Sequence, residues 1–180
     1  MTVDPQPSRD SRVASFDAVV SHYEKDLLRY AARIMNNPSA SQDVVQDAFI
    51  RLFRHWKLEF VPSPQISSWL YRVVHNCAVD SLRRQARHDL LHTRHADEQP
   101  AFAPSNRGEG FEISEAAEQA ATALQTLDLR ERQLVILKVY EEKSYKEISE
   151  ITGLTVTNVG YILHHAMKKL AAALKEAKAI

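Results

Sequence analysis

Three arginines, a tryptophan and an asparagine recur at helical spacing between residues 67 and 87, in the stretch SSWLYRVVHNCAVDSLRRQAR. The residues on this polar face are separated by three or four positions: Trp69, Arg72, Asn76, Asp80, Arg83 and Arg87. Arginine binds phosphate through paired hydrogen bonds, tryptophan offers a stacking surface, and asparagine can hydrogen-bond a base edge. The polar face therefore suits a nucleic-acid strand, although the same pattern would also occur on a solvated helix.

The other side of this helix is apolar and predicts a packed core. It carries Leu70, Val73, Val74, Cys77, Ala78 and Leu82. Cys77 is the only cysteine of the chain, so no internal disulfide can form, which is typical of a cytoplasmic protein.

Two further helices are predicted before residue 67. The first begins near Ser15, after a disordered N-terminus over residues 1–14, and stops at the Asn-Asn-Pro of residues 36–38. The second opens on a capping box formed by Ser39 and Gln42. Its outer face carries Asp43, Gln46, Asp47 and Arg51. Residues 59–67 are expected to be a loop, because Pro62 and Pro64 disfavour helix.

Residues 92–118 differ in character from the segments on either side. They contain two prolines and two glycines, and residues 95–118 hold six acidic residues against one arginine. This composition predicts a flexible acidic linker between helical domains at 15–91 and 119–180. His88, His92 and His95 lie near its start, but no carboxylate or cysteine completes a recognisable ligand set. We therefore expect neither a metal nor a cofactor.

The last part of the chain reads as a helix-turn-helix. A helix over residues 130–140, with Leu134, Leu137 and Val139 buried, is followed by the capping box of Ser144 and Glu147. Gly153 then supplies a tight turn before a long helix from residue 155 or 156 to about 175. This last helix is expected to bury one face, formed by Val156, Val159, Leu163, Ala166 and Leu170.

Composition excludes several classes of protein. The formal net charge is zero, but residues 61–94 hold five arginines against two aspartates, so the charge is strongly partitioned along the chain. No apolar run is long enough to span a membrane, and the N-terminus does not resemble a secretion signal. An enzyme is not indicated, because no catalytic motif and no glycine-rich phosphate loop occur.

Three segments in this order carry a family resemblance: DVVQDAFIRLFRHW, then SWLYRVVHNCAVDSLRR, then LDLRERQLVILKVYEEKSYKEISEITGLTVTNVGYILHHAMKKL. Together they resemble a bacterial sigma factor of the extracytoplasmic-function (ECF) type, with its region 2 and region 4 domains. The resemblance implies an all-α, two-domain transcription initiation factor that binds core RNA polymerase and promoter DNA, with an anti-sigma factor as a further partner.

The resemblance also implies roles for individual residues. The second helix would bind polymerase through the outer face already described. The loop over residues 58–68 would capture a flipped base of the −10 element, and Asn76 would line that pocket, with Trp69, Tyr71 and Arg72 near the opened strand. Arg83, Arg84 and Arg87 would hold the duplex backbone. The −35 element would be bound by the last helix through Thr155, Thr157, Asn158, Tyr161, His164, His165, Lys168 and Lys169.

One departure from the family affects that last helix. Family members usually carry several arginines or lysines where Gly160, Ile162 and His165 stand, and here only Lys168 and Lys169 are permanently charged. Two alternatives to a promoter-selecting factor therefore remain open. One is an adapter that binds polymerase or an anti-sigma factor without initiating, and the other is an ordinary helix-turn-helix regulator.

The acidic linker would suit the basic nucleic-acid channel of the polymerase.

Overall fold

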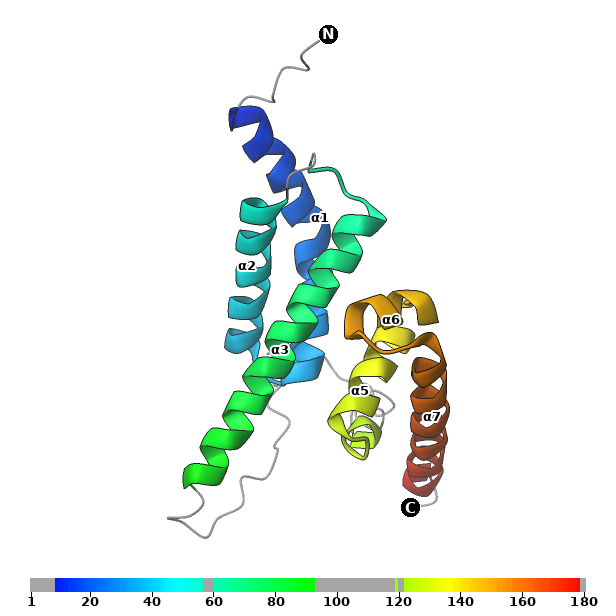
Figure 1. Ribbon diagram of the computed structural model, residues 1–180. Helices are drawn as coiled ribbons and strands as arrows, with labels where there is room; N and C mark the ends of the chain where they lie inside the picture. Colours follow the sequence, from blue (N-terminus) through cyan, green and yellow to red (C-terminus); the bar gives the residue numbers. More distant parts are fainter. Residues whose placement is uncertain (1–8, 57–59, 93–118, 120–121, 179–180) are drawn as a thin grey trace. The chain divides into compact units, whose positions relative to one another are not determined.

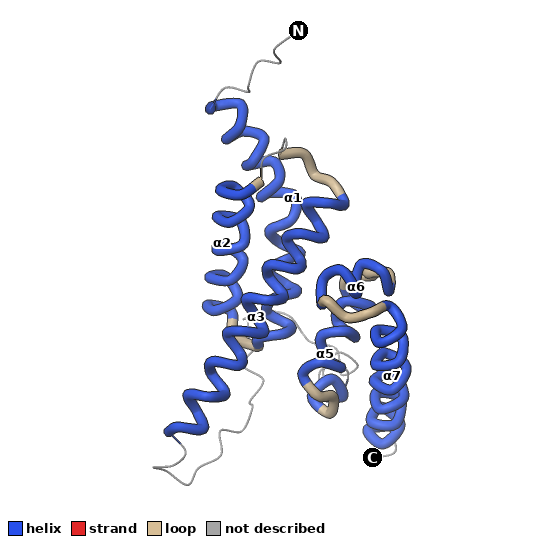
Figure 2. The backbone as a smooth tube through the Cα atoms, viewed as in Figure 1, coloured by secondary structure: helices blue, strands red, loops and turns tan. Residues whose placement is uncertain are grey.

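The protein is helical throughout the residues that the computed structural model describes, namely 9–56, 60–92, 119 and 122–178. These residues contain no strand, and loops join the helices (Figure 2). The chain divides into two compact units, one ending at His92 and the other beginning at Thr93. The all-α fold with two helical domains is thus confirmed. The predicted linker, apart from His92, lies outside the described residues.

Three helices form the first unit: α1 (Arg9–Met35), α2 (Pro38–His55) and α3 (Pro64–His92). Each packs against the other two (Figure 1). The apolar faces of the three helices meet in the core, which includes Val19, Leu27, Tyr30, Ile34, Val45, Ala48, Leu52, Ile66, Leu70, Val74 and Ala78. Burial of such side chains stabilises the fold by about 1.5–3 kcal/mol each. Residues 83–88 of α3 carry exposed side chains.

The N-terminal ends of these helices differ from the sequence-based expectation. Helix α1 already begins at Arg9, so residues 9–14 are helical rather than disordered. The cap of α2 is Asn37, whose side chain accepts a hydrogen bond from the Ala40 amide, and not Ser39. Pro38 then occupies the first helical position, where a missing amide hydrogen costs nothing.

Helix α3 begins earlier than predicted for the same reason. Its first residue is Pro64, within the segment that was expected to be a loop up to residue 67. Proline is tolerated in a first turn, and the Ser63 hydroxyl accepts a hydrogen bond from the Ile66 amide at 3.3 Å. Helix α3 therefore starts directly after Ser63, and this start fixes the positions of the residues that follow Pro64 in the helix.

The second unit contains α5 (Leu129–Val135), the π-helical turn η1 (Ile136–Tyr140), α6 (Tyr145–Thr152) and α7 (Val156–Lys178). Its core is built from Leu134, Ile136, Leu137, Ile148, Ile151, Val159, Leu163 and Ala166. The prediction that Val139 is buried was wrong, because it is 51% exposed. Val139 lies within the π-helical turn, which holds more residues than an α turn, so it leaves the face that regular α-helical spacing assigns to it.

Candidate nucleic-acid interface

The polar face of α3 lies on the outside of the first unit. Arg72, Asn76, Asp80, Arg83 and Arg87 are all exposed, as the spacing predicted. Trp69 is half-buried and meets Trp56, the residue that caps α2, in an edge-to-face contact with 6.3 Å between ring centroids. The contact holds the Trp69 ring beside the connection between α2 and α3. One side of α3 thus presents an aromatic ring, an amide and several guanidinium groups to solvent.

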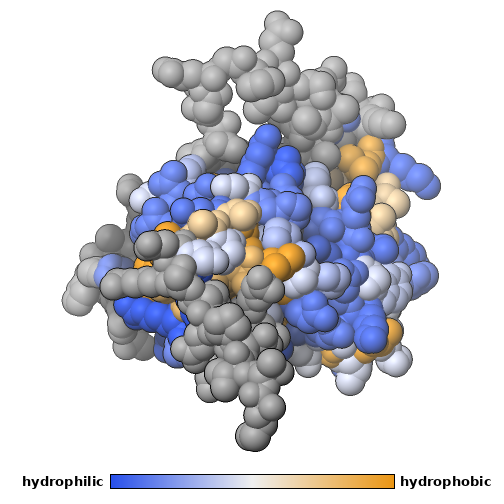
Figure 3. Space-filling model, turned by 90° about the horizontal axis from the view of Figure 1, so that it is seen from above, coloured by the Kyte–Doolittle hydropathy of each residue, from blue (hydrophilic) through white to orange (hydrophobic). Residues whose placement is uncertain are grey.

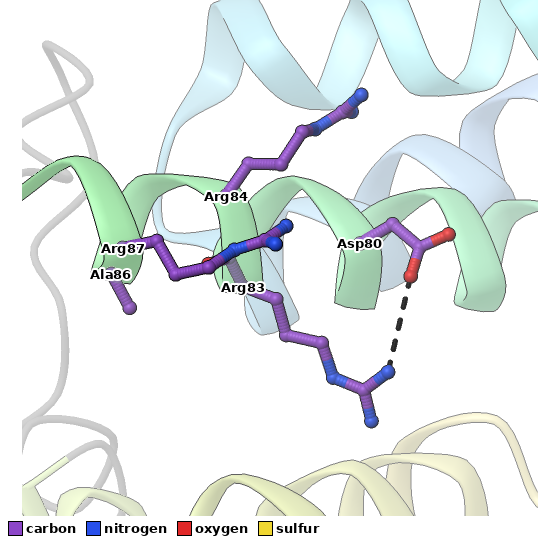
Figure 4. A pocket seen from close by; sticks show the side chains of 5 residues that line it. All are labelled: Asp80, Arg83, Arg84, Ala86 and Arg87. Carbon is purple, nitrogen blue, oxygen red and sulfur yellow. Dashed lines mark hydrogen bonds and ion pairs between the residues drawn. The ribbon is translucent and has the colours of Figure 1, made fainter.

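The arginines toward the end of α3 point in different directions (Figure 4). Arg83 and Arg84 project to opposite sides of the helix, and the Arg87 side chain runs back along it. Arg83 lies 4.0 Å from Asp80, and both side chains are more than two-thirds exposed, so this surface ion pair is weak. A phosphate could therefore replace Asp80 as the partner of Arg83 at little cost.

Tyr71 was expected to lie near an opened DNA strand, and this prediction was wrong. Its side chain is 4% exposed and packs against Tyr30 of α1, with 5.3 Å between ring centroids. Tyr71 shares a helix face with Val74, His75 and Ala78, three, four and seven positions further on, all of which are buried. It belongs to the core, and the helical spacing could have shown this.

His75 is a buried titratable residue that the sequence analysis missed. It is 6% exposed, and its Nδ1 lies 2.9 Å from the hydroxyl of Tyr30. Burial, with a smaller effect of the positive charge on Arg83, lowers the pKa of His75 from 6.5 to about 4. The imidazole is therefore neutral near pH 7 and serves the packing of α1 against α3.

The candidate polymerase contacts on α2 share one exposed face. Asp43, Gln46, Asp47 and Arg51 are all exposed. Arg51 pairs with Asp47 at 3.0 Å, one turn apart. Two acidic side chains, one amide and one guanidinium thus face solvent on the side of α2 that does not enter the core, where a partner protein could reach them.

Connections in the second unit match a helix-turn-helix. Ser144 and Glu147 form the predicted capping box at the start of α6. Gly153 ends α6 with φ of 73°, a left-handed conformation that glycine adopts without strain. The hydroxyl of Thr155 accepts a hydrogen bond from the Asn158 amide at 3.3 Å and caps α7. Thr155 thus has a structural part to play besides the contact with DNA expected of it.

The outer face of α7 presents the predicted side chains to solvent. Thr157, Asn158, Tyr161, His164, His165 and Lys168 are all exposed. Tyr161 is 66% exposed and lies against His165, with 4.4 Å between ring centroids. Val156, expected to be buried, is 47% exposed, and the buried face of α7 begins at Val159. The face therefore carries hydrogen-bonding and aromatic groups with little permanent charge.

Lys169 differs from the other predicted −35 residues. Its Nζ donates to Oε1 of Glu131 in α5 at 2.6 Å, and this hydrogen bond raises the pKa of Lys169. Oε2 of Glu131 accepts a hydrogen bond from the Asp128 amide at 3.1 Å. Asp128 and Glu131 form a capping box at the start of α5 that the sequence analysis overlooked, although the Asp-x-x-Glu spacing was visible.

The remaining surface gives little indication of another kind of site. On the face shown in Figure 3, hydrophilic side chains cover most of the described surface and hydrophobic ones form small patches. Within the described residues, no group of three His, Cys, Asp or Glu side chains could hold a metal ion. Of the histidines considered for a metal, His95 and the side chain of His92 lie outside those residues. None of the described helices is both long and apolar enough to span a membrane.

Comparison with known proteins agrees with this arrangement. A family model of Sigma-70 region 2 matches residues 19–88, and a model of Sigma-70 region 4 matches residues 117–170. The RNA polymerase sigma factor SigV of Bacillus subtilis is 27% identical over 150 residues, covering 83% of this chain and 84% of SigV. The ECF RNA polymerase sigma factor SigW of the same organism is 24% identical and covers 90% of both chains.

Solved structures with the same fold include the sigma factor RpoE in complex with the anti-sigma factor NepR from Bartonella quintana. The TM-score is 0.67 at 19% identity, over 89% of this chain and 96% of that one. CnrH, solved in complex with the cytosolic domain of CnrY, gives a TM-score of 0.62 at 22% identity, over 93% and 92% of the two chains.

Proposed function

We propose that this chain, which belongs to the sigma-70 family as a transcription initiation factor of the ECF type, reads the −10 element with the polar face of α3 and the −35 element with α7. The observation that carries the proposal is the series formed by half-buried Trp69 and exposed Arg72 and Asn76, on a helix that is buried on its other side. A helix-turn-helix in the same chain supplies the second reading surface.

Opening of a promoter exposes unstacked bases and a displaced strand. An enzyme or factor that captures an extruded base must offset the cost of unstacking it. Trp69 can stack on a base, Asn76 can hydrogen-bond its edge, and Arg72 can bind the adjacent phosphate. Arg83, Arg84 and Arg87 lie further along α3, where exposed guanidinium groups would hold the duplex that remains paired.

Reading of the −35 element would rely more on shape and hydrogen bonds than on charge. Thr157, Asn158 and Tyr161 can contact base edges, and His164 and His165 add further hydrogen-bonding groups. Lys169 pairs with Glu131 of α5, whereas Lys168 is exposed on this face and is available to DNA. Few phosphates would therefore be neutralised. The upstream contact should therefore depend on salt less than that of a strongly basic helix.

The exposed face of α2 is the proposed contact with core RNA polymerase. Asp43, Gln46, Asp47 and Arg51 offer charged and polar groups without competing for the DNA-reading face of α3. The relatives of known structure were solved with an anti-sigma factor or a cytosolic partner domain, which supports an anti-sigma partner for this chain as well. A factor that acts with polymerase and chromosomal DNA would work in the cytoplasm.

Transcription in vitro from fragmented genomic DNA of the source organism tests the proposal. Core polymerase is supplied with this protein alone, and the transcript starts are mapped by sequencing. We expect starts that share a two-part upstream motif. Polymerase binding without discrete starts would instead favour an adapter, and failure of both would leave an ordinary DNA-binding regulator.

A matched pair of variants tests the assignment of the α3 face to the −10 element. Asn76→Ala should abolish discrete starts while leaving binding to polymerase intact. Arg29→Ala, on the exposed surface of α1 and paired with Asp26, should leave both unchanged. An Asn76→Ala protein that starts transcripts at the same positions and in the same amounts would overturn the assignment of Asn76 to the −10 element.

A further inference from the structure

The connection between α2 and α3 is held at both ends by side chains of α1. On one side, Nη2 of Arg12 donates to the carbonyl oxygens of Phe53 at 3.2 Å and of Trp56 at 3.0 Å. On the other side, the hydroxyl of Tyr23 donates to the carbonyl oxygen of Ser63 at 3.1 Å. These bonds link residues 40 to 44 positions apart in sequence.

Arg12 also joins an aromatic cluster that fixes Phe60 within the connection. Its guanidinium carbon lies 5.0 Å from the ring centroid of Phe60 and 5.6 Å from that of Phe53. The two rings are stacked at 5.9 Å with an interplanar angle of 7°, and Phe16 of α1 meets both of them edge-on. A planar guanidinium can stack on rings and donate in its plane at once, which an ammonium group does not.

The anchoring leaves exposed the residues of the connection that follow Phe60 and would meet the −10 element. Phe60 is 2% exposed, whereas the next residue, Val61, is 51% exposed and Pro62 is exposed as well. The carbonyls at the end of α2 have no partner within the helix, and Arg12 satisfies that of Phe53 while its charge complements the helix dipole. The described part of the connection, residues 60–63, is therefore anchored at Phe60 and at Ser63, and the two residues between them are exposed.

We infer that Arg12 and Tyr23 are positioning residues for reading of the −10 element, acting through the connection between α2 and α3. Neither residue needs to touch DNA, since Arg12 sets where Trp56 and Phe60 lie and Tyr23 sets where α3 begins. The inference rests on the proposed function of that connection. It assigns a role in promoter selection to two residues of α1, and one of them, Arg12, lies outside the residues that the region 2 model matches.

Two promoter libraries test the inference. They are built on a promoter found by start mapping, one with the −10 element randomised and the other with the −35 element randomised. Transcripts are sequenced with the wild-type protein and with Arg12→Ala, Tyr23→Phe and the control Arg29→Ala. Tyr23→Phe removes a single hydroxyl and keeps the ring, so it preserves the packing even if Arg12→Ala weakens the fold.

Base preferences at the −10 element should fall about fivefold for Arg12→Ala and for Tyr23→Phe, the scale expected for one hydrogen bond. Preferences at the −35 element should not change, and Arg29→Ala should match the wild type in both libraries. A fall in transcript yield with unchanged −10 preferences in both variants would overturn the inference, because a merely structural loss acts on all templates alike.

The same experiment distinguishes failure of the proposed function. If the wild-type protein itself showed no base preference at the −10 element, the proposed role of the α3 face would fall, and the inference with it.

A second measurement follows the anchoring directly. Amide hydrogen exchange at Trp56, whose amide donates to the Leu52 carbonyl and whose own carbonyl accepts from Arg12, should become faster in Arg12→Ala than in Arg29→Ala, and equal rates would overturn the inference.

Discussion

Lys169 of α7 and Glu131 of α5 form an ion pair with 2.6 Å between Nζ and Oε1. The Glu131 side chain is 9% exposed, and its other oxygen completes the capping box of α5. A carboxylate that is nearly buried depends on its partners, because an uncompensated charge in such a place is costly. Lys169 therefore joins two helices of the second unit, although its position in the sequence suggested a contact with DNA.

Lys168 and Lys169 should respond differently to replacement by alanine. Lys168→Ala should reduce the slope of log affinity against log salt for −35 DNA by about 1, the value for one lost phosphate contact. Lys169→Ala should change this slope less but lower the melting temperature of the protein more, since Glu131 loses its partner. Salt titrations of DNA binding and thermal unfolding of both variants provide the measurements. Equal loss of salt slope in both would place Lys169 on the DNA.

Gly160 lies in the middle of α7, where an alanine should be accommodated. A Cβ atom added there would lie 3.6 Å from the Tyr145 ring, an ordinary contact distance, and φ is normal for a helix. Because glycine in a helix interior costs about 1 kcal/mol relative to alanine, Gly160→Ala should raise the free energy of unfolding by about 0.5–1 kcal/mol. Urea denaturation measures the change.

Gly153→Ala is the matched control for that prediction. Gly153 has φ of 73°, so alanine should lower the free energy of unfolding by about 1–2 kcal/mol, although no atom lies within 4 Å of the added Cβ. If Gly160→Ala stabilised the protein but abolished transcription, Gly160 would be needed for close approach to DNA instead.

Substitution of Tyr71 should mainly affect stability, whereas substitution of its exposed neighbours should mainly affect promoter opening. Tyr71→Ala should lower the free energy of unfolding by about 3–5 kcal/mol, because it removes a buried ring. Arg72→Ala and Asn76→Ala should change stability by less than about 0.5 kcal/mol but reduce promoter opening. Urea denaturation and permanganate probing of unpaired thymines measure the two effects. A folded Tyr71→Ala protein with wild-type stability would contradict the burial of Tyr71.

Stability of the first unit should depend on pH through His75. Its pKa is about 4 in the folded protein and 6.5 in the unfolded chain, so between these values the unfolded chain binds more protons. The stabilisation is complete above pH 6.5 and is lost as the pH falls toward 4. At 1.36 kcal/mol for each unit of pKa difference, the loss amounts to about 3 kcal/mol.

Urea denaturation between pH 7 and pH 4.5 tests this dependence. The difference in unfolding free energy between wild type and His75→Gln should shrink as the pH falls, since glutamine does not titrate. Arg83→Gln should weaken the wild-type dependence slightly, because the positive charge on Arg83 adds to the effect of burial. Parallel curves for the wild type and His75→Gln would show that His75 is not the group responsible.

Helical spacing alone was sufficient to identify the helices of both units and most of their buried faces. Leu70 and Val74, Leu134 and Leu137, and Leu163 were all expected in the core, and all are buried. The capping box of Ser144 and Glu147 was readable in the same way, although the cap of α2 is Asn37 and not the expected Ser39. These features depend on side-chain directions and hydrogen bonds within one helix. The order of residues determines them directly, because the residues involved are only a few positions apart.

Contacts between distant residues were decided by the tertiary structure. Arg12 looked like part of a disordered tail because its acceptors, the carbonyls of Phe53 and Trp56, come together only when α2 ends beside α1. The family resemblance suggested a DNA contact for Lys169, and its ion pair with Glu131 was not visible because the two residues are 38 positions apart in sequence. A helical wheel gives the direction of a side chain but not its partner, which depends on how the helices pack.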